Sequence, residues 1–451
     1  MTPPTPPPSI ALSHLLDHTA DMVQGVREGR SLTELLVRVP APARAGTQAL
    51  TFQVLRALGG AQAVRSVVAP KTPPPAVDAL LVAAIALLWP PAAGERPTYP
   101  DHTLVDQAVH AAHQRTPAAA AFVNAVLRRF VRERDTLIAA AEHLPVGAFN
   151  HPLWWIERLK QEWPAHWQVL LREANRHPPM TLRVNARRST AAAYVQRLAA
   201  AGQAARASGS HTVVLAEPCP VTLLPGFAEG QVSVQDAAAQ RAAPLLLGDT
   251  GLAADANARP FTLAPGARVL DACAAPGGKT AHLLELADLD VLALDSDAAR
   301  LLRVQQTLTR LHLNASLKAA DARQPATWWD GRPFDAILLD APCTASGIVR
   351  RHPDIRWLRR PDGIAALARV QAQLLDALWP LLAPGGRLLY ATCSLFKAEG
   401  QQQIDAFLQR QGAGGARLDP ASPGHLLSLP DNANAGAATA DGFFYALIHK
   451  P

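Results

Sequence analysis

The stretch DACAAPGGKT, residues 271–280, follows the apolar segment ARVL and leads into TAHLLELA, which has a helical pattern. A strand, a glycine turn and a helix are therefore predicted in this order, because adjacent glycines let the backbone approach a ligand at the helix N-terminus. Gly278-Lys279-Thr280 matches the end of a phosphate-binding loop, but position 273, where that motif requires glycine, is Cys. This mismatch disfavours nucleotide hydrolysis and leaves a ligand-binding turn or a purely structural one.

Strand-like and helix-like segments alternate on both sides of this turn, from about Gln231 to the end of the chain. Such alternation predicts a Rossmann-like, doubly wound parallel sheet, in which ligands bind where strands end and helices begin. Strands are predicted at 267–273, 291–295, 315–321, 334–340, 387–393 and 443–449, with helices at 363–382 and 398–410 among those between them. The residues that directly follow the strands are therefore the first candidates for chemistry.

The rest of the chain divides by pattern and composition. Apolar residues at three- and four-residue spacing predict helices throughout the first third, whereas MTLRVN (180–185) and TVVLAE (212–217) read as strands around a helix. The prediction is a Pro-rich disordered tail at 1–8, an all-helical domain at 9–148, a small α/β module at 149–230 and the doubly wound domain at 231–451. The connection at 248–266 is long, polar and rich in alanine.

Charge and cysteine content limit the possible functions. The net charge of the 451 residues is +6, and residues 151–200 hold eight Lys and Arg against three Asp and Glu, a local excess that suits a polyanionic partner. Four scattered cysteines form neither a disulfide framework nor a zinc cluster, so we expect a reducing, cytoplasmic setting and no metal. No signal peptide is expected, and the apolar segment at 79–89 is too short to span a membrane.

Polar residues end four of the predicted strands. Asp295 lies where an acid accepts hydrogen bonds from ribose hydroxyls, and Asp321, after the next strand, could hold an adenine amino group, although either alone is more often a helix cap. LLDAPC brings Cys343 to the same edge, and YATCS brings Cys393. Polar neighbours favour reactive thiols over inert core cysteines, and a redox pair is a weaker alternative because no CxxC arrangement is present.

The motifs DACAAPGGKT, LLDAPC and YATCS, in this order on these strands, resemble those of the RNA cytosine-5 methyltransferases. Three further segments resemble the RsmB/Sun type, which acts on bacterial 16S ribosomal RNA: ASGIVRRHPDIRWLRR (345–360), QVSVQDAAAQ (231–240) and DGFFYALIHK (441–450). The resemblance runs along essentially the whole chain, and it implies a NusB-like RNA-binding helical domain, an RNA-binding middle module and a class I methyltransferase domain that uses S-adenosylmethionine.

The resemblance also implies roles for individual residues. Cys393 would be the nucleophile that adds to carbon 6 of cytosine, Cys343 would assist its release, and Asp340 would hydrogen-bond the pyrimidine. The cofactor would lie against Cys273, Ala274, Ala275, Pro276, Gly277, Gly278, Lys279, Asp295, Asp321 and Asp340. Lys279 could instead lower the pKa of a neighbouring thiol.

The target base must leave its stack to meet the nucleophile, so RNA-binding residues are expected beside the site. Arginines and one tryptophan are the candidates: Arg350, Arg351, Arg356, Trp357, Arg359 and Arg360, then Arg183, Arg187 and Arg188, and on the helical domain Arg128, Arg129, Arg132 and Arg134. The implied partner of the monomer is 16S rRNA, at position 967, or a small-subunit assembly intermediate. Alternatives are another rRNA or tRNA site, a DNA methyltransferase, and a non-catalytic RNA-binding or assembly factor with the same fold.

Overall fold

The computed structural model describes residues 10–90, 97–248, 263–430 and 440–451. The predictions for 1–8 and for most of 248–266 lie outside these residues. The chain forms two compact units, each of which is described by itself. One comprises the chain up to His177 together with Val349–Pro361, and the other comprises Pro178–Ile348 and Asp362–Pro451. The helical unit thus includes a segment that the sequence analysis had placed in the doubly wound domain.

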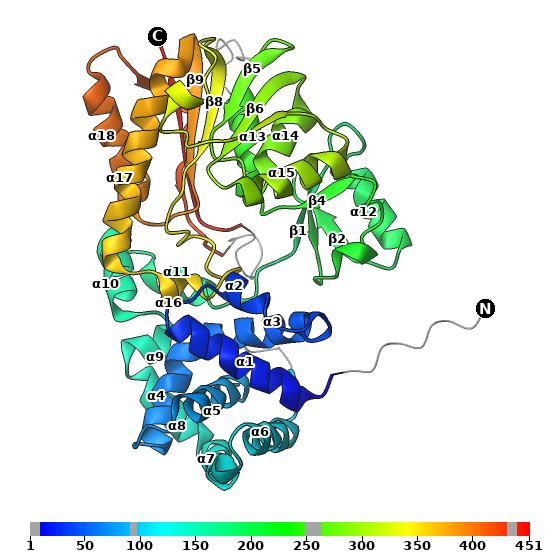
Figure 1. Cartoon of the computed structure of the whole chain (residues 1–451), viewed down its shortest axis with the longest axis vertical. Coiled ribbons are helices and arrows are strands. Elements are labelled where there is room, and N and C mark those ends of the chain that lie inside the picture. The colour runs from blue at the N-terminus through cyan, green and yellow to red at the C-terminus, as the bar shows by residue number, and fades with distance from the viewer. Residues whose placement is uncertain (1–9, 91–96, 249–262, 431–439) are drawn as a thin grey trace, which may run out of the picture. The chain divides into compact units, whose positions relative to one another are not determined.

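Helices alone build the described part of the first unit (Figure 1). They are α1 (Leu12–Arg27), α2 (Leu32–Leu36), α3 (Ala41–Arg56), α4 (Leu58–Val68), α5 (Pro75–Leu87), α6 (Asp101–Arg115), α7 (Ala120–Arg132), α8 (Arg134–Glu142), α9 (Pro145–Phe149), α10 (Leu153–Glu162), α11 (Trp167–Glu173) and α16 (Ile355–Leu358), with the 3-10 turn η1 (Pro117–Ala119). Helix α5 is the centre of the core, because every residue from Val77 to Ala86 is buried. The apolar segment at 79–89 is therefore a core helix, as predicted, and no described helix is long and apolar enough to cross a membrane.

Residues 349–361 are part of this helical unit. The guanidinium of Arg356, which is fully buried, donates to the carbonyl oxygens of Asn150, Ala174 and Val349 and to the side chain of Asn175. Burial lowers the pKa of Arg356 to about 9. Its role is to satisfy backbone carbonyls inside the unit.

The structure therefore corrects the expectation that this segment binds RNA through all of its basic and aromatic side chains. Arg350 and Arg356 are buried, and a group shielded by protein cannot contact a phosphate. Trp357 packs against the helical core and donates its indole N–H to the carbonyl oxygen of Leu55 at 2.9 Å. Arg351 and Arg359 are half-buried, and Arg360 is exposed.

In the second unit, a small antiparallel sheet with strand order β2-β3-β1-β4 comes first. Its strands are β1 (Thr181–Val184), β2 (Ala205–Ala207), β3 (Thr212–Leu215) and β4 (Val232–Val234), and helix α12 (Ala191–Ala200) lies between β1 and β2 in the sequence. Strands β1 and β3 and helix α12 lie where the sequence analysis placed them, but residues 149–177, which it assigned to this module, belong to the helical unit. The sequence analysis missed β2 and β4, and β4 belongs to this sheet although its residues had been assigned to the next domain.

The large sheet has the order β10-β12-β9-β8-β5-β6-β7, with β11 paired to β12. Its strands are β5 (Ala267–Asp271), β6 (Leu289–Asp295), β7 (Ser316–Ala319), β8 (Phe334–Asp340), β9 (Leu382–Thr392), β10 (Arg417–Leu418), β11 (Gly424–Leu426) and β12 (Phe443–His449). Five neighbouring strands of this sheet, in the order β9, β8, β5, β6 and β7, are parallel, and β12 runs antiparallel to β9. The Rossmann-like fold and its six main strands are thus as predicted.

Helices cover both faces of this sheet (Figure 1). They are α13 (Ala242–Leu247), α14 (Gly278–Leu286) and α15 (Ala298–Leu311) on one face, and α17 (Pro361–Leu378) and α18 (Gln401–Gln411) on the other. Strand β8 has apolar side chains on both faces of the sheet. Ala336 and Leu338 pack with the first group of helices, whereas Ile337 and Leu339 pack with the second. A strand buried on both faces reads as an unbroken apolar run, as FDAILLD does.

We expect Arg356→Met to destabilise the helical unit by about 2–4 kcal/mol, because it leaves buried carbonyl groups without their donor. Amide hydrogen exchange of the helical unit in the full-length chain measures this loss. Arg38→Met, at an exposed position, is the control and should change stability by less than about 0.5 kcal/mol. Unchanged exchange in the Arg356 variant, together with weaker RNA binding, would show that this arginine serves RNA after all.

Candidate active site

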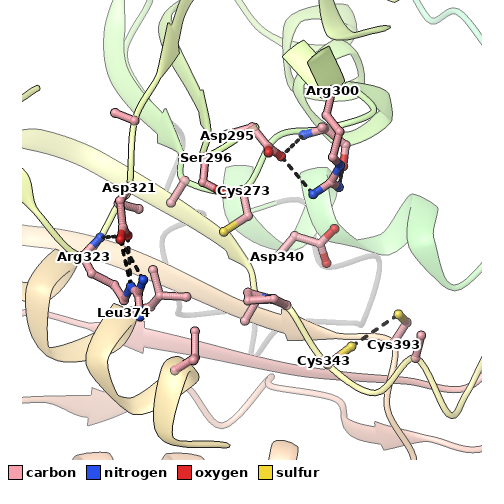
Figure 2. Close-up of a pocket in the computed structure, with 18 residues that line it drawn as sticks. Cys273, Asp295, Ser296, Arg300, Asp321, Arg323, Asp340, Cys343, Leu374 and Cys393 are labelled. Atoms are coloured by element: carbon pink, nitrogen blue, oxygen red, sulfur yellow. Dashed lines mark hydrogen bonds and ion pairs between the residues drawn. The ribbon is translucent and has the colours of Figure 1, made fainter. Parts of the chain in front are cut away.

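A pocket opens at the edge of the sheet where the parallel strands end (Figure 2). It is lined by residues from the ends of β5, β6, β7, β8 and β9 and from α17: Ala272, Cys273, Ala275, Asp295, Ser296, Arg300, Ala320, Asp321, Ala322, Arg323, Asp340, Ala341, Pro342, Cys343, Ala345, Val370, Leu374 and Cys393. Every Asp and Cys that the sequence analysis singled out at the strand ends lies on this wall. The fold therefore brings together residues that are separated by up to 120 positions.

The glycine turn forms the base of the site. Gly277 has a φ of +97°, and a Cβ atom there would approach the backbone of Val304 on α15 to 3.0 Å, so only glycine fits. Thr280 donates to the Asp271 carboxylate at 2.7 Å. Burial raises the pKa of Asp271 to about 7, and the Thr280 hydroxyl only partly offsets this effect. The first turn of α14 is thus tied to the end of β5.

Arg183, from β1 of the small sheet, holds the other side of this turn. Its side chain has no exposure and forms a two-pronged ion pair with Glu285 on α14, with both N···O distances at 2.8 Å. It also donates to the carbonyl oxygen of Gly278 at 2.7 Å and to the side chain of Gln235. The expectation that Arg183 binds RNA is therefore wrong, because all of its donors are directed into the protein.

Asp295 is the last residue of β6 and lines the pocket (Figure 2). Its carboxylate accepts from the backbone N–H of Ala275 at 3.2 Å and of Asp297 at 3.0 Å, and Arg300 lies 3.5 Å away. These contacts fix the carboxylate without using all of its lone pairs. Asp321 accepts hydrogen bonds from Arg323, and these bonds lower the pKa of its carboxyl.

Cys343 and Cys393 face each other, with a distance of 3.5 Å between their Sγ atoms (Figure 2). Both are free thiols. The hydrogen bond to Cys393 and burial raise the pKa of the Cys343 thiol. A raised pKa favours the protonated form of the Cys343 thiol at neutral pH. Cys273 lies apart from this pair, and burial raises the pKa of its thiol as well.

Lys279 and Asp340 form an ion pair beside the thiols, with an N···O distance of 2.6 Å. Burial alone would lower the pKa of Lys279, but the charge of Asp340 and its hydrogen bond to Lys279 are the main effects that outweigh burial, so the pKa is raised. The ammonium group also lies 5.4 Å from the centre of the Phe443 ring. Lys279 is thus positively charged at neutral pH.

The remaining arginine candidates differ in their surroundings. Arg187 and Arg188 are exposed on the small α/β module, and Arg128 is exposed on α7. The other three arginines of that group carry acidic partners: Arg129 and Arg132 pair with Glu133, and Arg134 pairs with Asp101. RNA contact by Arg128, Arg187 and Arg188 therefore stays a prediction. The charges of Arg129, Arg132 and Arg134 are partly neutralised by their acidic partners.

The sequence analysis missed Glu399, which lies in the 3-10 turn η6 (Lys397–Glu399) and is completely buried. Its carboxylate accepts hydrogen bonds from Thr344 and Ser394, the residues that directly follow the two facing cysteines. A single Glu in the polar run KAEGQQQ gives no periodic or motif signal that would have identified it.

The fold and site together define a class I, Rossmann-like methyltransferase. Two family models match the chain: "16S rRNA methyltransferase RsmB/F" over residues 260–449, and the ferredoxin-like domain of RsmF/B-like methyltransferases over residues 151–222. Among solved structures, PH0851 has a TM-score of 0.70 at 25% identity, covering 96% of this chain and 99% of its own. A methyltransferase homologue from Pyrococcus horikoshii has a TM-score of 0.55 at 27% identity, with 68% and 97% covered.

Relatives of similar length are more alike in sequence. The ribosomal RNA small subunit methyltransferase B of Pseudomonas syringae pv. tomato is 47% identical over 362 residues, which are 78% of this chain and 77% of the relative. That of Vibrio cholerae is 46% identical over 358 residues, with 78% and 77% covered. The chain belongs to the ribosomal RNA small subunit methyltransferase B family, and its cofactor is S-adenosylmethionine.

We expect loss of the Arg183 contacts with Glu285 and Gly278 to weaken binding of S-adenosylmethionine about tenfold or more, because the turn at Gly278 loses its support from β1. The test variant is Arg183→Met combined with Glu285→Leu, since removing the arginine alone would leave a buried charge. Calorimetric titration with the cofactor measures the affinity.

Arg206→Met on the exposed strand β2 is the matched control for the Arg183 prediction. A folded double variant with the affinity of the unmodified chain would show that the Arg183 contacts do not support cofactor binding.

Proposed function

We propose that this chain transfers the methyl group of S-adenosylmethionine to carbon 5 of a cytosine in 16S rRNA through a covalent bond between Cys393 and the base. The observation that carries this proposal is the pair of free thiols 3.5 Å apart, beside Asp340 and on the wall of a class I methyltransferase pocket. A protein that only binds RNA has no need for two facing thiols there. The names of its relatives, ribosomal RNA small subunit methyltransferase B, support the choice of substrate.

The cofactor fits the part of the pocket around the glycine turn. The lone pairs of Asp295 that its backbone donors leave unused suit ribose hydroxyls, and Asp321 lies farther along the same edge, where the adenine would be. Cys273 and Ala275 line the intervening wall. When bound, S-adenosylmethionine supplies an electrophilic methyl group.

Carbon 5 of cytosine is a weak nucleophile, so the protein must activate the ring. The Cys393 thiolate forms a bond to carbon 6, the electrons of the carbon 5–carbon 6 double bond shift into the ring, and nitrogen 3 takes a proton. Carbon 5, activated in this way, would accept the methyl group that bound S-adenosylmethionine supplies. Removal of the proton from carbon 5, together with return of the nitrogen 3 proton to Lys279, restores the carbon 5–carbon 6 double bond and expels Cys393 as a thiolate, which completes the cycle.

The surroundings of each thiol favour this division of roles. The positive charge of Lys279 near Cys393 favours attack by that thiol as a thiolate, and Cys343, 3.5 Å away, takes the carbon 5 proton after its own proton has passed to water. We infer that Asp340, which pairs with Lys279, accepts a hydrogen bond from the amino group of the base, while Lys279 is the proton source for nitrogen 3.

Two cysteine variants test the mechanism. We expect Cys393→Ala to abolish methyl transfer, because no covalent bond can form. Cys343→Ala should instead accumulate a protein–RNA adduct that survives denaturant, because release is blocked. Gel analysis with 16S rRNA and labelled cofactor measures both, and Cys219→Ala is the control thiol from outside the site. An adduct in the Cys393 variant together with normal turnover in the Cys343 variant would reverse the two roles.

The substrate is tested by mapping 5-methylcytosine in 16S rRNA from cells that contain this chain, its Cys393→Ala variant or neither. We expect the mark at position 967 only with the unmodified chain. The same map of tRNA and 23S rRNA tests the alternative sites. An identical map in all three strains would contradict the proposal, and association with small-subunit particles without methylation would favour the non-catalytic assembly factor.

A further inference from the structure

Glu399 connects the two segments that carry the facing cysteines. One carboxylate oxygen accepts from the backbone N–H of Thr344 at 2.9 Å and from the amide of Gln371 at 3.2 Å. The other accepts from the hydroxyl groups of Thr344 and Ser394, the latter at 2.6 Å. Because Thr344 follows Cys343 and Ser394 follows Cys393, a single side chain fixes both neighbours of the thiol pair.

Further hydrogen bonds make this connection rigid. The backbone carbonyl of Glu399 accepts from the hydroxyl groups of Tyr390 and Thr392, so η6 is tied to the end of β9. Ser346, on the Cys343 loop, accepts from the backbone N–H of Leu395 at 2.8 Å and contacts Ser394 at 3.0 Å. The carboxylate thus sits at the centre of a fully buried polar network, the kind of arrangement that specifies one geometry.

The two cysteines depend on this network to different degrees. Cys393 directly follows β9, whose last residue, Thr392, is paired with Phe444 of β12. Cys343 lies three residues beyond β8, on a loop in which Ala345 adopts a left-handed φ of +59°. A non-glycine residue in that conformation is strained and needs the surrounding structure to hold it. Loss of the Glu399 bridge should therefore displace Cys343 more than Cys393.

We propose that Glu399 is a positioning residue that sets the separation of the Cys343 and Cys393 thiols and, through it, the rate at which the covalent intermediate is released. The second half of this inference rests on the proposed function. Glu399 touches neither thiol, so it acts through Thr344 and Ser394. Burial raises the pKa of its carboxyl above the usual value, and the donors offset only part of this effect.

The first experiment measures thiol separation and is independent of RNA. Diamide removes two electrons and two protons from a close thiol pair and forms one disulfide. We expect the Cys343–Cys393 disulfide, identified by peptide mapping of the full-length chain, to form about tenfold more slowly in Glu399→Ala than in the unmodified protein. Glu399→Gln has the same shape and can keep the bridge, so its rate should stay within about threefold.

The second experiment measures turnover of 16S rRNA with S-adenosylmethionine. In Glu399→Ala we expect kcat to fall about 10- to 100-fold, KM for the cofactor to stay within twofold, and the denaturant-stable adduct to increase, because a displacement of about 1 Å can cost this much. Gln403→Met is the matched control, since Gln403 is buried and bonds to Ala368 without touching the cysteine segments. It should leave the adduct level unchanged.

The outcomes separate the possibilities. Unchanged disulfide and adduct kinetics in folded Glu399→Ala overturn the proposal, and equal impairment of Glu399→Gln would assign the effect to charge instead of bridging. Where Glu399→Ala does not fold, Thr344→Val removes one tie and should slow both readouts about threefold; no effect there also overturns it. Slower disulfide formation without any adduct in any variant would keep the thiol positioning and refute the covalent mechanism.

Discussion

Parallel pairing of β5, β6, β8 and β9 is the constraint on which the site depends. In a parallel sheet all carboxyl ends meet at one edge, so the residues that follow these strands must converge. Asp271 pairs with Leu338 next to it, and Asp340 pairs with Ala391. This register brings Asp340 to the level at which β9 ends and Cys393 begins. The distance between the thiols is then decided only by the short loops beyond the strands.

Burial of charge at this edge has a second consequence. Each of Asp271, Lys279, Asp340 and Glu399 has either a charged partner or hydrogen-bond donors. Groups held this way cannot reorient at the moment of reaction, so their fields are already in place when charge moves. Burial raises the pKa of Asp271, whereas the hydrogen bond to Cys393 comes first, and burial second, in raising the pKa of Cys343.

Much of this site could be predicted from the sequence, because the apolar pattern of the strands and the order of the motifs are both visible in the sequence itself. Asp295, Cys343 and Cys393 were found as polar interruptions of apolar strands. The arginines of 350–360 were misread because an arginine-rich segment looks the same whether it faces RNA or caps buried carbonyls. Arg356 is buried because it bonds to Asn150 and Asn175, which lie about 200 positions away in the sequence. Long-range partners of this kind leave no local pattern.

Two other differences have the same physical origin. Strand β9 begins at Leu382, five residues before the predicted start, because a register shift against β8 admits the Pro-Gly-Gly segment that reads as a break. Glu399 was invisible because its partners Gln371 and Thr344 belong to other elements. Local propensity identifies where strands and helices form, whereas the pairing of buried polar groups is settled only when those elements pack.

The route of the chain between β8 and α17 connects these findings. The chain leaves the second unit after Ile348, contributes Val349–Pro361 to the helical unit and returns at Asp362. The Cys343 loop is fixed at its start by the central strand β8, and Thr344 and Ser346 tie it to the segment that carries Cys393 and Glu399. A loop held at several points loses less entropy when it is ordered further, so the hydrogen bonds of Glu399 help to hold Ala345 in its strained conformation. Inside the helical unit, Arg356 of the inserted segment donates to buried carbonyl groups, so its charge serves the fold of that unit.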